Sequence, residues 1–189
     1  MTAILAYLLG SIPFGIVVAK AFGLGDPRNI GSGNIGATNV LRTGNKRAAA
    51  LTLVLDAGKG GIAVLVARAI IGEDAAQVAG VLAFLGHVFP IYPGFKGGKG
   101  VATFFGTILA LALPVGLASG VVWLLTAAIL RYSSLSALVA ASAAPLIAFF
   151  AGHENSVMAI CAMSLLIFIR HKANIIRLWN GSEPKIGKK

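Results

Sequence analysis

Long apolar segments follow one another along almost the whole chain and leave little sequence for a water-facing surface. Of the 189 residues, 57% are hydrophobic and only 12% are charged. A soluble globular domain carries roughly 25% charged residues. Because a helix needs about 20 apolar residues to cross the hydrocarbon core of a bilayer, the sequence predicts an all-α integral membrane protein.

Seven segments are long and apolar enough to be predicted as transmembrane helices. They are residues 3–22, 48–71, 75–91, 99–113, 115–130, 135–151 and 156–169. The uncharged stretch 101–130 could be one long tilted helix, which gives six spans, or two helices that meet near Pro114. With two helices, the basic loops and the basic tail all fall on one side, as the positive-inside bias demands. We therefore expect seven transmembrane helices in a single domain, residues 1–189, with the N-terminus outside and the C-terminus in the cytoplasm.

The first predicted cytoplasmic loop is dense in glycine and in neutral hydrogen-bonding side chains. It reads NIGSGNIGATNVLRTGNKR, residues 29–47. Ser32, Asn34 and Thr38 offer hydroxyl and amide groups, and Arg42 offers a planar guanidinium that can grip a phosphate or carboxylate with two hydrogen bonds. Such a loop can fold into a cavity if its polar groups find partners, whereas a solvated connector is the alternative interpretation.

A second glycine-rich run, GFKGGKGVAT at residues 94–103, stands at the edge of an apolar segment. It does not match the nucleotide-binding Walker pattern, because Gly100 follows Lys99 where that pattern needs Ser or Thr. The backbone amides of Gly97, Gly98 and Gly100, the charges of Lys96 and Lys99, and the start of the next helix still favour a phosphate group. A lipid-headgroup anchor is the alternative.

The tail begins with RHKANIIRLWNGSE, residues 170–183. His171 and Asn174 are three residues apart, so we expect them on one face of the seventh helix as it leaves the membrane. Histidine is the side chain best suited to exchange a proton near neutral pH. Arg170 and Lys172 are interpreted as ordinary charges that end a transmembrane segment.

The remaining charged and metal-binding residue types give weaker signals. Asp56 and Lys59 lie one helical turn apart inside the second span, where a self-neutralising pair is expected, although a role in a cavity stays open. The three histidines are scattered and the inner loops hold few carboxylates, so neither a metal site nor a cofactor is expected. We assign the net charge of +10 to membrane topology, with no nucleic acid as a partner.

Four stretches taken together resemble the bacterial acyl-phosphate-dependent glycerol-3-phosphate acyltransferases, the PlsY family. They are GSIPFG (10–15), NIGSGNIGATNVLR (29–42), GHVFPIYPGFKGGKGVAT (86–103) and RHKANIIRLWNGSE (170–183). The resemblance implies a multi-pass enzyme of the bacterial cytoplasmic (inner) membrane with its active site on the cytoplasmic side. It implies transfer of a fatty acyl group from acyl phosphate to the 1-hydroxyl of sn-glycerol 3-phosphate, which gives lysophosphatidic acid and phosphate in the first acylation of phospholipid biosynthesis.

The resemblance also assigns expected roles to single residues. Ser32 and Arg42 match essential polar residues of the first motif, and Gly97, Gly98, Lys99 and Gly100 match a loop that binds glycerol phosphate. His171 and Asn174 match a required pair. Glu183 matches a position with a structural part, and Asn34 and Thr38 are expected to support the first loop.

Direct acyl transfer without a covalent intermediate is the expected mechanism, because the phosphate of acyl phosphate is a good leaving group. We expect Lys99 and Arg42 to clamp phosphate, and Ser32 and Asn174 to orient the acceptor. Either His171 or a substrate phosphate takes the proton. The first loop, the second glycine-rich run and the tail are expected to meet in one electropositive pocket beneath the inner leaflet.

Two other functions fit parts of the pattern. A transporter for a phosphorylated metabolite also needs cations in a membrane cavity, although polar groups on the outer side and inverted repeats are not visible. A lipid-binding scaffold needs basic patches but not the density of glycine and asparagine in the first loop. Acyl-CoA-dependent acyltransferases place Asp five residues after a catalytic His, whereas Tyr92, Met158 and Ile176 stand there in this chain.

Overall fold

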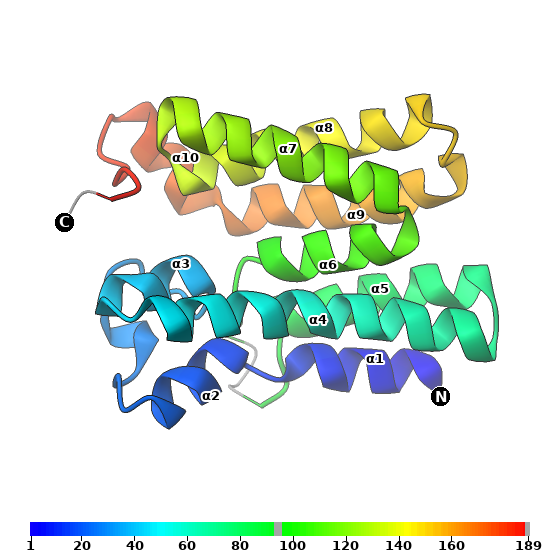
Figure 1. Cartoon of the computed structure of the whole chain (residues 1–189), viewed down its shortest axis with the longest axis horizontal. Helices are drawn as coiled ribbons and strands as arrows, with labels where there is room; N and C mark the ends of the chain where they lie inside the picture. The colour runs from blue at the N-terminus through cyan, green and yellow to red at the C-terminus, as the bar shows by residue number, and fades with distance from the viewer. Residues whose placement is uncertain (93–95, 188–189) are drawn as a thin grey trace. The chain divides into compact units, whose positions relative to one another are not determined.

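The computed structural model describes residues 1–92 and 96–187, and in those residues it contains helices and no strands (Figure 1). The α-helices are α1 (Thr2–Ser11), α2 (Phe14–Ala21), α3 (Ala37–Val40), α4 (Lys46–Ile70), α5 (Glu73–Val88), α6 (Val101–Leu111), α7 (Leu113–Leu130), α8 (Ser133–Phe150), α9 (Glu154–Arg170) and α10 (Lys172–Trp179). Two short 3-10 helices, η1 (Pro27–Asn29) and η2 (Leu41–Thr43), flank α3. The predicted all-α fold class is confirmed.

The chain divides into two compact units, Met1–Leu111 and Ala112–Lys189. The positions of the units relative to one another are not determined. The expectation of a single domain therefore stays a prediction, and each unit has its own packing and its own polar sites.

Prolines set two of the helix boundaries. Pro13 lacks an N–H and disfavours helical geometry at Ile12, whose backbone is extended, and α1 and α2 are bent by 43°. The predicted single helix over residues 3–22 is thus a bent pair. Ala112 is also extended, and Pro114 lies in the first turn of α7, where a missing N–H costs nothing. The stretch 101–130 is therefore two helices, as the seven-span prediction requires.

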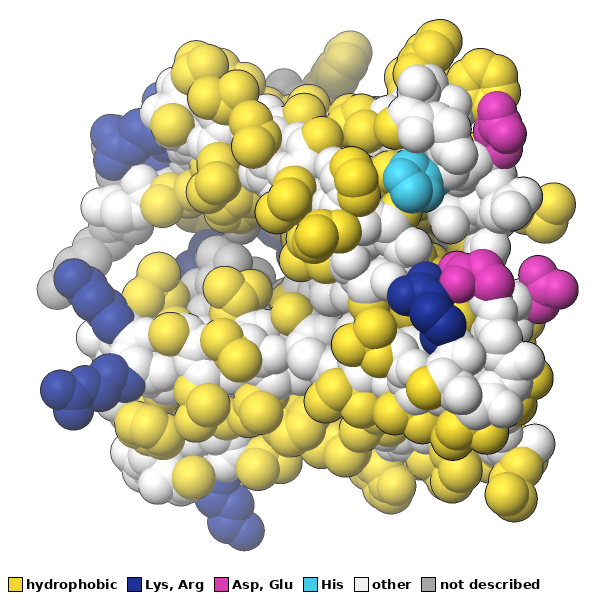
Figure 2. All heavy atoms as spheres, turned by 45° about the vertical axis from the view of Figure 1, so that its right-hand side comes forward, with side chains coloured by type: hydrophobic (Ala, Val, Ile, Leu, Met, Phe, Trp, Pro, Cys, Tyr) yellow, Lys and Arg dark blue, Asp and Glu magenta, His cyan; other side chains and the backbone are white. Residues whose placement is uncertain are grey.

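Within the described residues, three helices, α4, α7 and α8, are long and apolar enough to cross a membrane, and the number rises to five if each bent pair, α1 with α2 and α9 with α10, is one span. Helix α6 is apolar but has 11 residues, and α5 has 16. The count of seven spans and the orientation of the termini stay predictions. Hydrophobic side chains cover much of the visible surface (Figure 2). Strongly exposed examples are Ile70, Leu124, Ile129 and Phe150.

The helices of the first unit approach one another closely through glycines. A Cβ on Gly10 would overlap the backbone of Ala83, so α1 and α5 touch backbone to backbone. A Cβ on Gly106 would likewise meet the carbonyl of Ala57, which brings α6 against α4. Small residues allow such approach where lipid provides no hydrophobic drive for helix association. Helix α6 therefore packs directly against the backbone of α4 at Ala57.

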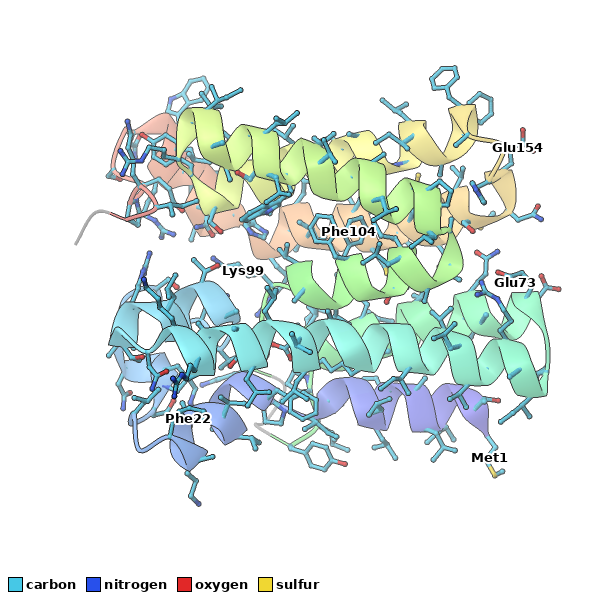
Figure 3. All side chains as sticks on the ribbon, in the orientation of Figure 1. Met1, Phe22, Glu73, Lys99, Phe104 and Glu154 are labelled. Carbon is cyan, nitrogen blue, oxygen red and sulfur yellow. The ribbon has the colours of Figure 1, made fainter. Side chains whose placement is uncertain are left out.

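Arg68, the single basic residue that departs from the charge pattern of the loops, has a local explanation. Its Nε lies 2.6 Å from Oε2 of Glu73, across the α4–α5 connection. Its guanidinium also donates to the carbonyls of Ala110 at 2.6 Å and Leu111 at 3.2 Å. Arg68 thus satisfies the carbonyl end of α6, where a cation is favourable. In Figure 3, Glu73 and Met1 lie at the same end of this unit, and Lys99 lies well away from that end.

In the second unit α8 packs between α7 and α9, and α10 contacts both α8 and α9. The segment after α10 folds back onto the α7–α8 connection. There the Ile186 N–H donates to the carbonyl of Arg131 at 2.6 Å, and the Arg131 guanidinium donates to the carbonyl of Ile186 at 3.0 Å. This return places Glu183 beside the start of α8. Figure 3 labels Glu154 at the opposite end of the unit.

Candidate functional site

The first loop is organised around Asn39, which is almost fully buried. Its Oδ1 accepts hydrogen bonds from the amide of Ser32 at 3.1 Å and from the hydroxyl of Ser32 at 3.3 Å. Its Nδ2 donates to the carbonyls of Pro27 and Asn34, both at 2.7 Å. One side chain thereby fixes the path of the loop on both sides of Ser32. Sequence reasoning missed Asn39, because nothing in the pattern separates it from the other asparagines of the loop.

Arg42 lies over this organised loop. Its guanidinium approaches Oδ1 of Asn39 at 3.5 Å. Gly31 has a positive φ of 54°, and a Cβ there would press on the side chains of Arg42 and Asn39. Both Arg42 and Ser32 are exposed. The loop therefore presents a guanidinium and a hydroxyl that both contact Asn39, with the half-buried Asn34 and the exposed Thr38 in the same segment.

The first loop is anchored to the helices by apolar packing. Val18, Val40, Ala48 and Ala49 form a buried cluster that joins α2, α3 and the first turns of α4. Gly15 lies so close to Ile35 that a Cβ would overlap the Ile35 carbonyl. Gly15 of GSIPFG and the first loop thus belong to one packed region.

The second glycine-rich segment is described for Lys96 to Gly100, and its residues Pro93, Gly94 and Phe95 lie outside the described residues. We call residues 96–100 the glycine loop. The amide of Gly98 donates to the carbonyl of His87 at 3.1 Å. A Cβ on Gly98 would meet the imidazole of His87, and a Cβ on Gly100, which has a φ of +83°, would meet the ring of Phe84. The end of α5 therefore shapes the loop.

The glycine loop leads directly into α6 and carries two cations. Lys96 is exposed and Lys99 is half-buried. The carbonyl of Gly100 accepts the first helical hydrogen bond, from Phe104 at 2.7 Å. Lys99 therefore directly precedes the positive end of a helix in the chain, an arrangement that favours a bound anion.

A buried charged cluster lies beneath the glycine loop. Lys59 Nζ lies 2.9 Å from Oδ1 of Asp56, which confirms the expected pair. The same Oδ1 lies 3.4 Å from Nδ1 of His87. The third member could not be predicted from spacing, because His87 comes from α5 whereas the other two come from α4.

In the second unit His171 ends α9 and is buried. Its Nδ1 lies 2.8 Å from the carbonyl oxygen of Ile167. A carbonyl can only accept, so this contact assigns the proton of a neutral imidazole to Nδ1. Nε2 is then the nitrogen that can accept a proton.

Glu183 gathers the polar groups of the third motif. Its Oε1 accepts hydrogen bonds from Asn174 Nδ2 and Ser134 Oγ, each at 2.6 Å. Its Oε2 accepts from Arg177 Nε at 2.6 Å. Burial by itself would raise the pKa of Glu183, but the hydrogen bonds from Ser134, Asn174 and Arg177 hold its pKa below the ordinary value of 4.5. The carboxylate therefore stays ionised and fixes the amide of Asn174.

The helix that carries His171 is bent where the sequence predicts one continuing helix. His171 and Asn174 are predicted on one face of the seventh helix as it leaves the membrane, whereas α9 and α10 are bent by 60° at His171. His171 lies at the corner and Asn174 lies in the first turn of α10, and both side chains are buried.

The predicted site residues are divided between the two units. Ser32, Asn34, Thr38, Arg42 and the glycine loop belong to the first unit, and His171, Asn174 and Glu183 belong to the second unit. The expectation of one shared pocket stays a prediction. Across the described ranges 1–92 and 96–187, no group of three or more His, Cys, Asp or Glu side chains is placed to hold a metal ion.

Comparison with known proteins gives a consistent result along the chain. The family model for glycerol-3-phosphate acyltransferase matches residues 1–181. A glycerol-3-phosphate acyltransferase of Jannaschia sp. (strain CCS1) is 66% identical over 188 residues, covering 100% of this chain and 93% of its relative. One from Dinoroseobacter shibae is 61% identical over 189 residues, with 100% and 93% covered.

Two crystal structures of PlsY, an integral membrane glycerol 3-phosphate acyltransferase, share the fold. The glycerol 3-phosphate form has a TM-score of 0.93 and 44% identity, and covers 98% of this chain and 94% of the other. The lysophosphatidic acid form has a TM-score of 0.90 and 41% identity, with the same coverage. The chain is accordingly a multi-pass membrane protein.

Proposed function

Because the chain belongs to the glycerol-3-phosphate acyltransferase family, the PlsY family, we propose that it transfers a fatty acyl group from acyl phosphate to the 1-hydroxyl of sn-glycerol 3-phosphate. The products are lysophosphatidic acid and inorganic phosphate. The observation that carries this proposal is the family match over residues 1–181, which includes the first loop, the glycine loop, His171 and Asn174. Acyl transfer follows from family membership, and the donor and mechanism are the finer parts of the proposal.

Acyl phosphate is the proposed donor for two chemical reasons. It is a mixed anhydride with phosphate as leaving group, so attack by a hydroxyl needs no covalent enzyme intermediate. In addition, no histidine of this chain is followed five residues later by Asp. A donor that also carries phosphate matches a protein with several phosphate-binding groups.

In the first unit, the glycine loop and Arg42 are proposed to bind phosphate. Lys99 supplies a compact charge next to the start of α6, and Lys96 adds a second, exposed charge at the same loop. Arg42 offers two parallel N–H donors, which suit a phosphate group. The amide of Gly98 already donates to His87, so Gly98 contributes its small size, which lets the loop lie against the imidazole.

In the second unit, His171 and Asn174 are proposed to act on the acceptor hydroxyl. The hydroxyl oxygen attacks the acyl carbon, the bond from that carbon to the phosphate oxygen breaks, and the hydroxyl proton passes to Nε2 of His171 or to the departing phosphate. Since Glu183 holds Nδ2 of Asn174, Oδ1 is the end that can receive the acceptor hydroxyl. In the first unit, Ser32 is proposed to offer a hydroxyl that orients the acceptor. We propose that this chemistry takes place on the cytoplasmic side of the inner membrane.

The test is an assay of the purified full-length protein in phospholipid vesicles with acyl phosphate and labelled glycerol 3-phosphate. We expect labelled lysophosphatidic acid and an equal amount of phosphate, released only when the acceptor is present. Acyl-CoA and acyl carrier protein loaded with the same fatty acid serve as matched donors, and we expect little product from either. Phosphate release without the acceptor would contradict direct transfer.

The same vesicles separate the enzyme from a transporter. Uptake of labelled glycerol 3-phosphate into the vesicle lumen without labelled lipid would overturn the proposed acyltransferase. Product made equally well from acyl-CoA would keep the enzyme class and overturn the donor.

A further inference from the structure

We propose that the buried cluster of Asp56, Lys59 and His87 positions the glycine loop, so that Lys99 meets the phosphate of the acceptor. This inference rests on the proposed function, because it assigns the loop to glycerol 3-phosphate. It gives a role to three buried residues that are not themselves proposed to touch a substrate.

The three side chains of the cluster are deeply buried. Asp56 and Lys59 are 1% and 2% exposed, and His87 is 4% exposed. Charges buried so deeply are expensive unless they are paired and hydrogen-bonded. A pair on one helix would neutralise itself without help. Here the Asp56 carboxylate also faces the imidazole of a second helix, at 3.4 Å, so the cluster links α4 to α5.

Residues of the cluster also form hydrogen bonds that involve backbone carbonyls. Lys59 Nζ donates to the carbonyl of Ile12 at 3.0 Å, at the break between α1 and α2 where Pro13 interrupts the helical hydrogen bonds. The hydroxyl of Thr103, in the first turn of α6, donates to the carbonyl of Asp56 at 2.8 Å. Asp56 and Lys59 therefore contact the α1–α2 break and the start of α6, and His87 adds the end of α5.

The glycine loop contacts the cluster through His87. His87 contacts Gly98 twice, because its carbonyl accepts the Gly98 amide at 3.1 Å and its ring fills the space where a Cβ would stand. Gly98 immediately precedes Lys99. The imidazole lies between Asp56, whose Oδ1 is 3.4 Å from its Nδ1, and Gly98, so its position limits how closely the glycine loop can approach α5. His87 is thus a positioning residue for Lys99.

The geometry provides a test in which two changes compensate. The three atoms nearest to a Cβ on Gly98 all belong to the imidazole of His87. Gly98→Ala should therefore displace the loop, and His87→Ala should open the space that the new methyl group needs. For Gly97 the nearest atoms are the His87 carbonyl, the Val88 carbonyl and a Pro90 side-chain atom, which His87→Ala does not remove. Gly97→Ala is the matched control.

The experiment measures KM for glycerol 3-phosphate, KM for acyl phosphate and kcat in the full-length protein and these variants, alone and combined. When two residues are in contact, the effect of changing both differs from the sum of the two single effects. We expect Gly98→Ala to raise the acceptor KM about tenfold or more, and the combination with His87→Ala to recover at least about fivefold of that loss. The donor KM should change less than about twofold. With Gly97→Ala no recovery is expected.

Further variants keep the test decisive. Thr52→Ala alters a buried hydroxyl of α4 that bonds to Ala48 in the same helix at 2.8 Å, and it should leave the acceptor KM unchanged. If His87→Ala fails to fold, His87→Asn retains a polar group near Asp56 and shortens the side chain toward Gly98, so the same recovery is expected. Equal effects of Gly98→Ala with and without His87 would overturn the inference.

A second measurement separates this inference from the proposed function. The rise in melting temperature caused by glycerol 3-phosphate needs no turnover, and it should be lost in Gly98→Ala and restored in the combined variant. Wild-type protein without acyltransferase activity would overturn the proposed function, while the ligand-induced shift would still decide the inference. A wild-type protein that acylates normally but shows no compensation would overturn the inference alone.

Discussion

The two units hold their polar groups by different means. In the first unit the glycine loop and the first loop are shaped by close backbone approach, where Gly98 meets His87 and Gly31 meets Arg42 and Asn39. In the second unit one carboxylate, Glu183, gathers Ser134, Asn174 and Arg177. The first arrangement depends on the absence of a Cβ and the second on the presence of a charge. The first unit should therefore be sensitive to side-chain volume, and the second to protonation.

Lys99→Ala should cause the largest loss of substrate affinity, because it removes the charge that the glycine loop is proposed to present to phosphate. We expect weaker binding of glycerol 3-phosphate by about 2 to 5 kcal/mol, the cost of truncating one partner of a buried charged contact. KM for glycerol 3-phosphate in the purified variant is the measurement. The matched control is Lys96→Ala, which removes an exposed charge from the same loop and should cost much less. An unchanged acceptor KM in Lys99→Ala would contradict the assignment.

Glu183→Gln examines the charge in the second unit. The substitution retains the size of the side chain but weakens three hydrogen bonds to a charged acceptor, so we expect a loss of about 1 to 3 kcal/mol in the free energy of unfolding. Thermal unfolding of the detergent-solubilised protein measures it. Glu154→Gln, a carboxylate at the first residue of α9 in the same unit, is the control and should change the melting temperature little.

The pH dependence of the melting temperature, compared between wild type and Glu183→Gln, shows whether the ionised Glu183 carboxylate stabilises the fold. Because the pKa of Glu183 is lower in the folded protein than its ordinary value of 4.5, the folded state binds this proton less readily than the unfolded state. The contribution is fully present above pH 4.5 and is lost as the pH falls through the folded pKa. The melting temperatures of wild type and Glu183→Gln should therefore converge in acid. A constant difference down to pH 3 would show that the charge is not what stabilises this motif.

Gly31→Ala and Gly44→Ala separate backbone strain from side-chain volume in the first unit. Both glycines have positive φ, 54° and 88°, but a Cβ on Gly44 would meet nothing within 4 Å. Each substitution should cost about 1 kcal/mol of stability through the unfavourable conformation. Only Gly31→Ala should also lower kcat/KM, because its methyl group displaces Arg42. Equal activity in the two variants would remove the proposed link between loop shape and Arg42.

The same contrast explains how much the sequence could predict. Most features with local causes are predictable: the helical segments from apolar length, the break near Pro114 from the proline itself, and the Asp56–Lys59 pair from its spacing. The break at Pro13 has the same local cause, but the sequence prediction passed over it. Three features with tertiary causes were missed. Asn39 looks like its neighbouring asparagines until its burial is known, and His87 joins the pair from another helix. The 60° bend at His171 occurs where no proline or glycine marks it.

Glu73→Gln should give the smallest effect, because it tests a contact that neither unit uses for its polar site. The Glu73 side chain is 47% exposed and its partner Arg68 is 31% exposed, and exposed ion pairs contribute about 0.2 to 1 kcal/mol. The Arg68 side chain pulls the pKa of Glu73 below its usual range, but Arg68 also donates to the carbonyls of Ala110 and Leu111. Those hydrogen bonds survive in the variant.

Arg68→Ala should consequently destabilise the protein more than Glu73→Gln does, since it also leaves the carbonyl end of α6 without its cation. Asp74→Asn is the matched control, because Asp74 is the other acidic residue in the first turn of α5. Melting temperature and acceptor KM are measured together in all three variants. We expect an unchanged acceptor KM throughout, because the Arg68–Glu73 contact lies at the opposite end of α4 from the first loop. A raised KM in Arg68→Ala would mean that the two ends of α6 are mechanically coupled, so that the glycine loop depends on how α6 is held at its far end as well as on His87.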